Sequence, residues 1–128
     1  MATLHSAPIV AAAFLLLLAL AANVSRLRMV KGVSLGDGGH KGLHKAIRAH
    51  ANALEYTVPF MGLLVVWELS GAGQTEVLLA GAAFLFVRLI HAWGMLGRGR
   101  FMLRRAGAAL TYLLGVGLVV GVLVSSFR

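Results

Sequence analysis

The chain has 128 residues, of which 59% are apolar and only 12% are charged. Soluble domains are about 45–50% apolar and about 25% charged, so the composition excludes that class and indicates one integral membrane domain. The net charge of +8 would suggest nucleic acid in a soluble protein, but here the basic residues lie between apolar runs and are typical of charges that flank membrane helices. We therefore expect the lipid bilayer, and no nucleic acid, as a partner.

Four apolar segments follow one another at about residues 8–25, 43–69, 75–96 and 105–125. Each supplies the roughly 20 residues that cross about 30 Å of hydrocarbon. Each should be helical, because the bilayer offers no hydrogen-bond partner to an open backbone. The sequence thus predicts an all-α fold, a single bundle of four transmembrane helices that covers residues 1–128.

The first segment is nearly pure alanine, leucine and valine, and no Lys or Arg precedes it. A secretory signal peptide begins with basic residues, whereas here Arg26 and Arg28 come after the apolar run. We interpret the segment as a retained membrane helix. It contains no acidic residue, which disfavours a small four-helix exporter driven by an intramembrane carboxylate.

The second segment carries polar residues in its first half. Arg48, Asn52 and Glu55 are spaced i, i+4 and i+7, which places them on one face of a helix. A short connection to the third segment predicts antiparallel neighbours, so Arg88 and His91 should lie at a similar depth. One interpretation is structural, in which Glu55 pairs with Arg88 or with a neighbouring subunit.

The other interpretation is a binding site. With Arg104 and Arg105, this polar set would converge at one end of the bundle, and arginines bind carboxylates through paired donors. A small anionic or zwitterionic ligand fits such a cluster. His40 and His44 have neither a cysteine nor a carboxylate beside them in the sequence, so we predict no metal site.

The basic residues are distributed unevenly between the connections. The first and third connections carry almost all of them: Arg26, Arg28, Lys31, Lys41, Lys45, Arg48, Arg98, Arg100, Arg104 and Arg105. Because cytoplasmic loops are rich in Lys and Arg, these two connections should face the cytoplasm and both termini should lie outside it.

Several stretches resemble one family. They are RAHANALEY at 48–56, followed by Pro59, RLIHAWG at 88–94, SRLRMVKGVSLGDGG at 25–39 and RRAGAALTY at 104–112. Together they resemble the MAPEG family, the membrane-associated proteins in eicosanoid and glutathione metabolism, and in particular its short bacterial members.

The resemblance implies a homotrimer in the bacterial inner membrane that binds glutathione at subunit interfaces, open toward the cytoplasm. It implies that Arg104, with Arg105 adjacent, activates the glutathione thiol. The residues that it implies for glutathione binding are Arg48, Asn52, Glu55, Tyr56 and His91, with Arg26 or Arg28 joining them.

The function implied is that of a glutathione transferase or peroxidase that acts on a lipophilic small molecule from the bilayer. The absence of cysteine fits a thiol that arrives with a cosubstrate. Two positions depart from other members of the family: Met95 stands where some have a tyrosine, and Tyr112 lies one turn later than their fourth-helix tyrosine. The alternative is therefore a non-catalytic scaffold that binds a ligand or partner.

Overall fold

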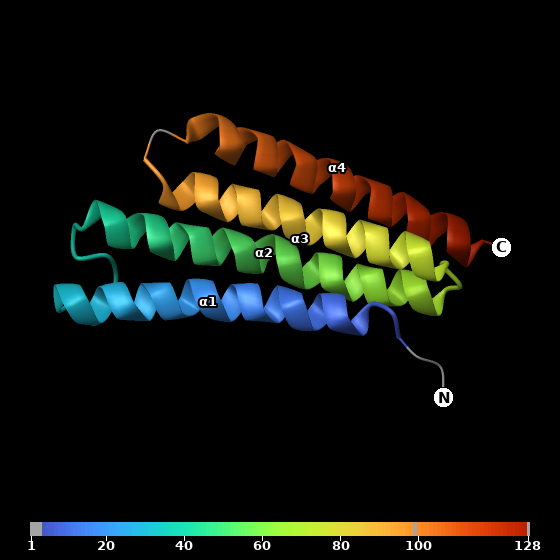
Figure 1. Ribbon diagram of the computed structural model, residues 1–128, viewed down its shortest axis with the longest axis horizontal. Coiled ribbons are helices and arrows are strands. Elements are labelled where there is room, and N and C mark those ends of the chain that lie inside the picture. Colours follow the sequence, from blue (N-terminus) through green and yellow to red (C-terminus); the bar gives the residue numbers. More distant parts are fainter. Residues whose placement is uncertain (1–3, 99, 128) are drawn as a thin grey trace.

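Four helices arranged side by side make up the structure, a computed structural model that describes residues 4–98 and 100–127 (Figure 1). In chain order the helices are α1 (Ala7–Lys31), α2 (Lys41–Leu69), α3 (Gln74–Leu96) and α4 (Phe101–Ser126). The α1–α2 and α3–α4 connections lie at one end of the bundle, and both termini lie at the other. The predicted all-α bundle is confirmed, and its two basic connections share one end.

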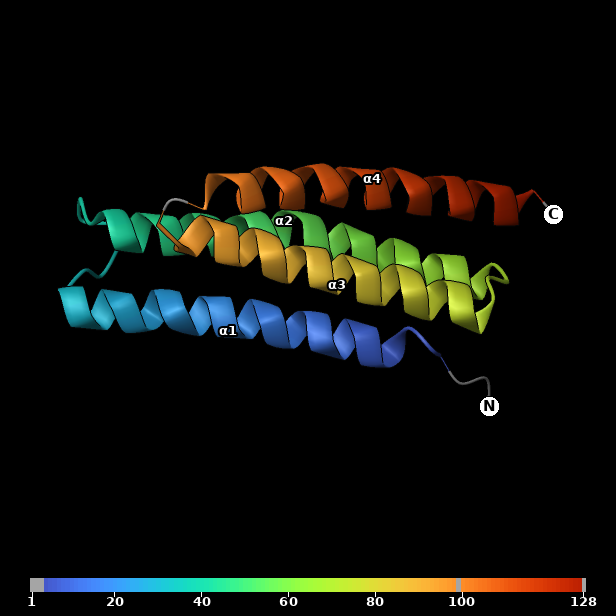
Figure 2. The ribbon, with the colours of Figure 1, turned by 45° about the horizontal axis from the view of Figure 1, so that its top comes forward.

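Three of the four helices, α1, α3 and α4, are long and apolar enough to cross a membrane. Within the described residues α2 does not meet that criterion, although it is the longest helix at 29 residues. The reason is in its sequence, because Lys41, Lys45, Arg48 and Glu55 lower the hydropathy of its first half. Both ribbon views show α2 running alongside its neighbours (Figure 2).

The first and fourth helices extend beyond the apolar runs that predicted them. After Pro8 in its first turn, α1 contains no proline or glycine before Gly32, which adopts the left-handed conformation (φ 64°) and ends the helix. Arg28 and Lys31 lie in the last turn, where positive charge is favourable against the helix dipole. The helix therefore continues past the apolar run into a basic end.

The interior is formed mainly by α2 and α3, with α1 packed on one side of this pair and α4 on the other. Phe60 and Phe84 stack at its centre, with ring centroids 3.7 Å apart. The larger apolar cluster contains Ala13, Phe60, Met61, Leu64, Val77, Phe84 and Leu118. Each helix contributes to it, so one cluster joins all four.

A carboxylate from α2 caps the start of α1. The Glu68 side chain accepts hydrogen bonds from the backbone N–H groups of His5 and Ser6, the latter at 3.0 Å. The first N–H groups of a helix have no partner within it, so this contact satisfies donors that would otherwise lack one. Sequence reasoning treated Glu68 only as a charge near a connection; its partner lies far away in the chain.

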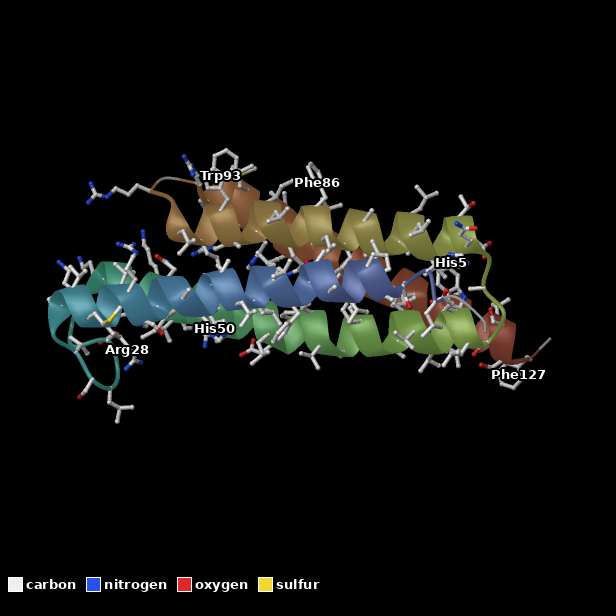
Figure 3. The ribbon with its side chains drawn as sticks, turned by 60° about the horizontal axis from the view of Figure 1, so that its bottom comes forward. His5, Arg28, His50, Phe86, Trp93 and Phe127 are labelled. Atoms are coloured by element: carbon white, nitrogen blue, oxygen red, sulfur yellow. The ribbon has the colours of Figure 1, made fainter. Side chains whose placement is uncertain are left out.

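Large apolar side chains cover the outside of the bundle. Phe86 and Trp93 project outward from α3 (Figure 3). Many others are more than half exposed, among them Phe14, Leu15, Leu79, Leu113 and Val116. Water would be a poor solvent for such a surface, whereas hydrocarbon is a good one, so the packing agrees with the composition.

Candidate functional site

A cavity of about 390 Å³ opens at the basic end of the bundle, between the start of α2, the end of α3 and the start of α4. We name it the basic cavity. Its lining residues are His44, Lys45, Arg48, Gly94, Met95, Gly97, Arg100, Phe101 and Arg104. Among the residues described around it, four are Lys or Arg and none is acidic. The cavity is therefore suited to an anionic ligand.

Close packing of α3 against α4 fixes the position of Arg104. A Cβ atom added at Gly94 would lie 2.6 Å from the Arg104 backbone nitrogen, so only glycine permits the helices to approach this closely. One turn further along the interface, a Cβ atom added at Gly107 would lie 2.7 Å from the Cβ of His91. These two glycines hold the first turns of α4 against α3 and bring Arg104 to the cavity.

The arginines at the start of α4 differ in what they face. Arg104 lines the basic cavity and Arg105 does not. Both guanidinium groups lie near the Phe101 ring, at 5.2 and 5.3 Å from its centroid. Arg100 also lines the cavity, and its guanidinium lies 4.4 Å from the centroid of the Trp93 ring. Of the two arginines that the resemblance selects, Arg104 is the one that a ligand in this cavity would meet.

Deeper in the bundle, Arg88 joins three helices. It is only 1% exposed; its Nη2 donates to Asn52 Oδ1 at 2.7 Å and its Nη1 donates to Thr111 Oγ1 at 3.3 Å. The Thr111 hydroxyl in turn donates to the Gly107 carbonyl oxygen at 2.7 Å. Asn52 and Arg88 thus lie at the same depth, as the antiparallel arrangement predicts.

The predicted ion pair between Glu55 and Arg88 does not form within residues 4–98 and 100–127. Glu55 is exposed on the outside of the subunit instead. Arg48, Asn52 and Glu55 share one side of α2, but about 60° around the helix separates Glu55 from Asn52, and Asn52 is the one that contacts Arg88. Arg88 is satisfied by neutral acceptors rather than by a carboxylate.

His91 is buried, 4% exposed, against Gly107 on α4. Its Nδ1 has no hydrogen-bond partner in the described part of the chain. The residue lies between the Arg88 network and Arg104 but does not line the basic cavity. Its evident contribution is to the tight contact of α3 with α4.

A second cavity, of about 380 Å³, lies between α2 and α4 over a floor from α3. We name it the tyrosine groove. Its lining residues are Tyr56, Pro59, Phe60, Leu63, Phe84, Thr111, Tyr112, Gly115, Val116, Val119 and Val120. At one end the Tyr56 and Tyr112 hydroxyls are 3.3 Å apart, and the Arg88 guanidinium carbon lies 5.7 Å from the Tyr56 ring centroid.

Sequence reasoning set Tyr112 aside and grouped Tyr56 with the ligands of the basic end. The structure places Tyr56 on the tyrosine groove and not among the residues that line the basic cavity. The sequence could have predicted that the two tyrosines lie close together, because α2 and α4 run in the same direction and each tyrosine lies near the middle of its helix. His44, Lys45 and Arg100 were also missed as cavity residues, although His44 and Lys45 precede Arg48 by one turn.

Arg26 and Arg28 lie near the end of α1 and do not line the basic cavity. Arg26 donates to Asn23 Oδ1 at 3.0 Å, and Arg28 donates to the Ser34 carbonyl oxygen at 2.7 Å. Figure 3 shows Arg28 beside the loop that leads to α2. Arg28 therefore fastens this loop within its own subunit.

The loop is also tied to α2, since His44 Nδ1 lies 2.7 Å from Asp37 Oδ2. Asp37 Oδ1 accepts the Gly39 N–H at 3.0 Å. These contacts lower the pKa of the exposed Asp37 carboxyl, chiefly through the Gly39 N–H and then through His44. Because His44 also lines the basic cavity, the loop and the cavity share a residue.

Comparison with known proteins identifies the family. The model of the MAPEG family matches residues 6–124, nearly the whole chain. The chain belongs to the MAPEG family. It is similar to the inner membrane protein YecN of Escherichia coli K12, with 40% identity over 98 residues that cover 77% of this chain and 74% of YecN. YecN of Escherichia coli O6:H1 matches to the same extent. The chain is thus a membrane protein of the MAPEG family, similar to bacterial inner membrane proteins.

Proposed function

We propose that this MAPEG protein is a glutathione transferase of the bacterial inner membrane, with peroxidase activity toward lipid hydroperoxides as a variant of the same thiol chemistry. The observation that carries the proposal is the basic cavity, in which Arg48 and Arg104 face one space from different helices. Glutathione has two carboxylates and a thiol. The carboxylates would bind the cations of the cavity, Lys45, Arg48 and Arg100. The planar guanidinium of arginine and the flexible ammonium of lysine both donate hydrogen bonds to carboxylates.

In this proposal Arg104 acts on the thiol. A free thiol with a pKa of about 8.5 is mostly protonated at neutral pH, and a nearby guanidinium favours the thiolate, which is the nucleophile. The thiolate would then attack a lipophilic electrophile supplied by the bilayer. The chain's own lack of cysteine leaves glutathione as the source of the sulfur.

A homotrimer is part of the proposal, supported by the position of Glu55. A carboxylate that faces hydrocarbon is costly and requires a partner or water. Because Glu55 is exposed on the single subunit, a second copy of the chain would cover it. Glutathione would then lie at the subunit interface, reached by Asn52, Glu55 and Tyr56 of one copy and by Arg26 or Arg28 of a neighbour.

We also propose an orientation of the bundle in the membrane. The end of the bundle that carries the basic cavity carries the two basic connections, and the bias of Lys and Arg toward cytoplasmic loops places that end in the cytoplasm. Both termini would lie outside. In this arrangement α2 crosses the membrane inside the trimer, shielded from lipid by other helices, which accounts for the polarity of its first half.

A second candidate is a non-catalytic scaffold that binds a ligand or partner without turnover. The observation that favours it is Met95, which lines the basic cavity where some family members have a tyrosine. A thioether cannot donate a hydrogen bond to a thiolate. The same cavity could therefore bind an anion without activating it.

The deciding experiment is titration of glutathione into the purified, detergent-solubilised protein by calorimetry, with absorbance near 240 nm followed for the thiolate. Binding with a thiolate signal is the expected result and would lead to a screen of electrophiles. Binding without thiolate would favour the scaffold. No binding at millimolar glutathione would reject the proposed function and leave the family assignment intact.

A further inference from the structure

A stripe of large apolar side chains runs along the outside of α3 toward the basic end of the bundle. Leu79, Phe86 and Trp93 are spaced seven residues apart, and they are 66%, 64% and 58% exposed. Seven residues make nearly two full turns, so the three lie almost in line along the helix. Figure 3 shows Phe86 and Trp93 projecting outward on the same side of the bundle. Because α3 is long and apolar enough to cross a membrane, this stripe is suited to contact with acyl chains.

At its basic end the stripe meets a cation. The Arg100 guanidinium lies 4.4 Å from the centroid of the exposed Trp93 ring. A Cβ atom added at Gly97 would lie 2.5 Å from Arg100 Cδ, so this glycine leaves room for the arginine stem to lie against the end of α3. An arginine that stacks on an aromatic ring keeps the N–H donors at the edge of its planar guanidinium available. Arg100 is thus held at the boundary between the apolar stripe and water, with donors for an oxyanion.

The connection between α3 and α4 has an excess of positive charge. Arg98 is exposed two residues before Arg100 and, unlike Arg100, does not line the basic cavity. No acidic residue occurs after Glu76 in the sequence. Within residues 4–98 and 100–127, neither arginine forms a salt bridge with a carboxylate. Both are therefore available to an anion from outside the subunit.

The depth of these arginines in the membrane selects a lipid rather than a dissolved anion. The connection joins the ends of two apolar helices, so Arg98 and Arg100 lie at the level of the phospholipid head groups. One acyl chain covers half of the hydrocarbon layer, about 15 Å. From Trp93 to Phe86 the stripe runs for about 10 Å, at about 1.5 Å per residue. A lipid whose phosphate lies at Arg100 therefore has an acyl chain long enough to pass Phe86.

The head group that fits this position carries a net negative charge. A zwitterionic head group presents an ammonium beside its phosphate, and the two arginines would repel that ammonium. The face of Trp93, which could otherwise hold a quaternary ammonium by a cation–π contact, is already occupied by Arg100. An anionic head group makes only favourable contacts here, because arginine binds phosphate through paired N–H donors. Basic surfaces at the ends of membrane helices recognise anionic lipids in this way.

We propose that the α3–α4 connection binds an anionic phospholipid, with its phosphate at Arg98 and Arg100 and one acyl chain along Trp93 and Phe86. The site adjoins the basic cavity, because Arg100 lines that cavity as well, but the lipid lies on the outside of the bundle. A bound lipid would thereby neutralise a cation that the cavity shares. Neither the family assignment nor the proposed use of glutathione requires this site.

The chain carries its own reporter for this site. It has two tryptophans, and Trp67 lies toward the opposite end of the bundle, where its Nε1 donates to Ser125 Oγ at 3.2 Å. The full chain with Trp67→Phe therefore fluoresces from Trp93 alone. It is reconstituted without glutathione in vesicles of phosphatidylglycerol and phosphatidylcholine, with bromine on the acyl chains of one lipid or of the other. Bromine quenches only a nearby indole, so the two arms together measure the relative affinity of the two lipids beside Trp93.

Each arginine near an anionic lipid surface contributes about fivefold to affinity, so two arginines should favour phosphatidylglycerol over phosphatidylcholine by about 25-fold. Arg98→Gln should lower this preference about fivefold, and the double variant Arg98→Gln/Arg100→Gln should abolish it. Lys31→Gln removes one positive charge at the same end of the bundle but from the last turn of α1. It is the matched control and should leave the preference unchanged.

The proposal is overturned by equal quenching from the two brominated lipids, or by an unchanged preference in the double variant. A loss in Lys31→Gln equal to that in Arg98→Gln would also overturn it, because net charge alone would then be the cause. Displacement of brominated phosphatidylglycerol by millimolar glycerol phosphate at constant ionic strength would show a site for dissolved phosphate instead. Absence of quenching by either lipid would show that a second copy of the chain covers Trp93. Because glutathione is absent from the experiment, none of these outcomes depends on the proposed function.

Discussion

The basic cavity and the tyrosine groove have nearly the same volume, about 390 and 380 Å³, and opposite chemistry. Both are bounded by α2 and α4, and the groove continues along these helices where the cavity ends. At the basic end the side chains between the helices are cations; near the middle they are phenols and aliphatic groups. The buried Arg88 with its acceptors Asn52 and Thr111 lies between the two regions.

This contrast shows how one bundle can meet water at its basic end and hydrocarbon along its sides. Cations are tolerated at the end of the helices, where water reaches them. In the interior, the buried Arg88 is held by neutral acceptors and excluded from solvent. A polar ligand can therefore approach along the bundle axis while an apolar one approaches from the side. The predictions below test the basic cavity first, then the helix contact and the hydrogen bonds that separate the two regions, and last the α1–α2 loop.

The largest effect is expected for Arg104→Ala. It removes the cavity cation assigned to the thiol, so the glutathione thiolate signal should fall by about 100-fold, as when one stabilising donor is lost from an active site. Absorbance near 240 nm measures the change. Arg105→Ala is the matched control, since it removes the same charge one residue away but outside the cavity lining. An equal loss in the two variants would contradict the assignment.

Gly94→Ala should destabilise the protein by about 3 kcal/mol, because its new Cβ meets the backbone of α4 rather than a side chain that can move. Anion binding in the basic cavity should weaken with it. Thermal unfolding followed by size-exclusion chromatography measures stability. Gly117→Ala, where nothing lies within 4 Å, is the control; a comparable loss there would show that the close α3–α4 approach is not the cause.

Asn52→Ala should cost about 1–2 kcal/mol, because a buried guanidinium loses its shortest hydrogen bond. The same thermal assay applies. Asn23→Ala breaks an exposed Arg–Asn bond of similar length, 3.0 Å, and should have little effect, since exposed contacts of charged groups contribute little. If the two variants behaved alike, Arg88 would not be the structural link between the two regions.

The smallest effect concerns pH at the α1–α2 loop. The Gly39 N–H and His44 lower the pKa of Asp37 from its ordinary value of 3.8, so the ionised form is favoured in the folded loop. The stabilisation is fully present above pH 3.8 and is lost as the pH falls through the lower folded-state pKa. The NMR shift of the Gly39 amide should follow this titration, and Asp37→Asn should abolish it. A midpoint at or above 3.8 in the native protein would contradict the prediction.

Much of the fold could be predicted from the sequence because each apolar run needs only length and composition to become a helix. The helix ends could not be predicted in this way. The apolar run stops at Ser25, whereas α1 continues to Lys31 and ends because Gly32 adopts the left-handed conformation, not because the hydropathy changes. The common depth of Asn52 and Arg88 followed from the short α2–α3 connection alone. The direction in which each side chain points around its helix could not be predicted, because it depends on how the helices pack against one another.

Some residues of the candidate site could likewise be predicted from the sequence and others could not. Arg48 and Arg104 were recognisable from their motifs, and they do share a cavity. Glu55 and Tyr56 belong to the same motif but do not line the cavity. Tyr56 is turned by about 80° from Arg48 around the helix, whereas Glu55 points in a similar direction to Arg48 but lies about two turns further along α2. Tyr112 could have been paired with Tyr56 by comparing depths in two helices of the same direction. The roles of Gly94 and Gly107 depend on side chains of another helix and have no local signal.

The Glu68 cap has a consequence for the order of biosynthesis. The carboxylate that receives the His5 and Ser6 amides is translated 62 residues after Ser6, so α1 leaves the ribosome with its start uncapped. That start acquires its partner only when the far end of α2 has been made and has returned to the same side of the bundle. The start of α1 is therefore capped only once α2 has been made, and the α1–α2 hairpin becomes a closed unit before α3 and α4 are added.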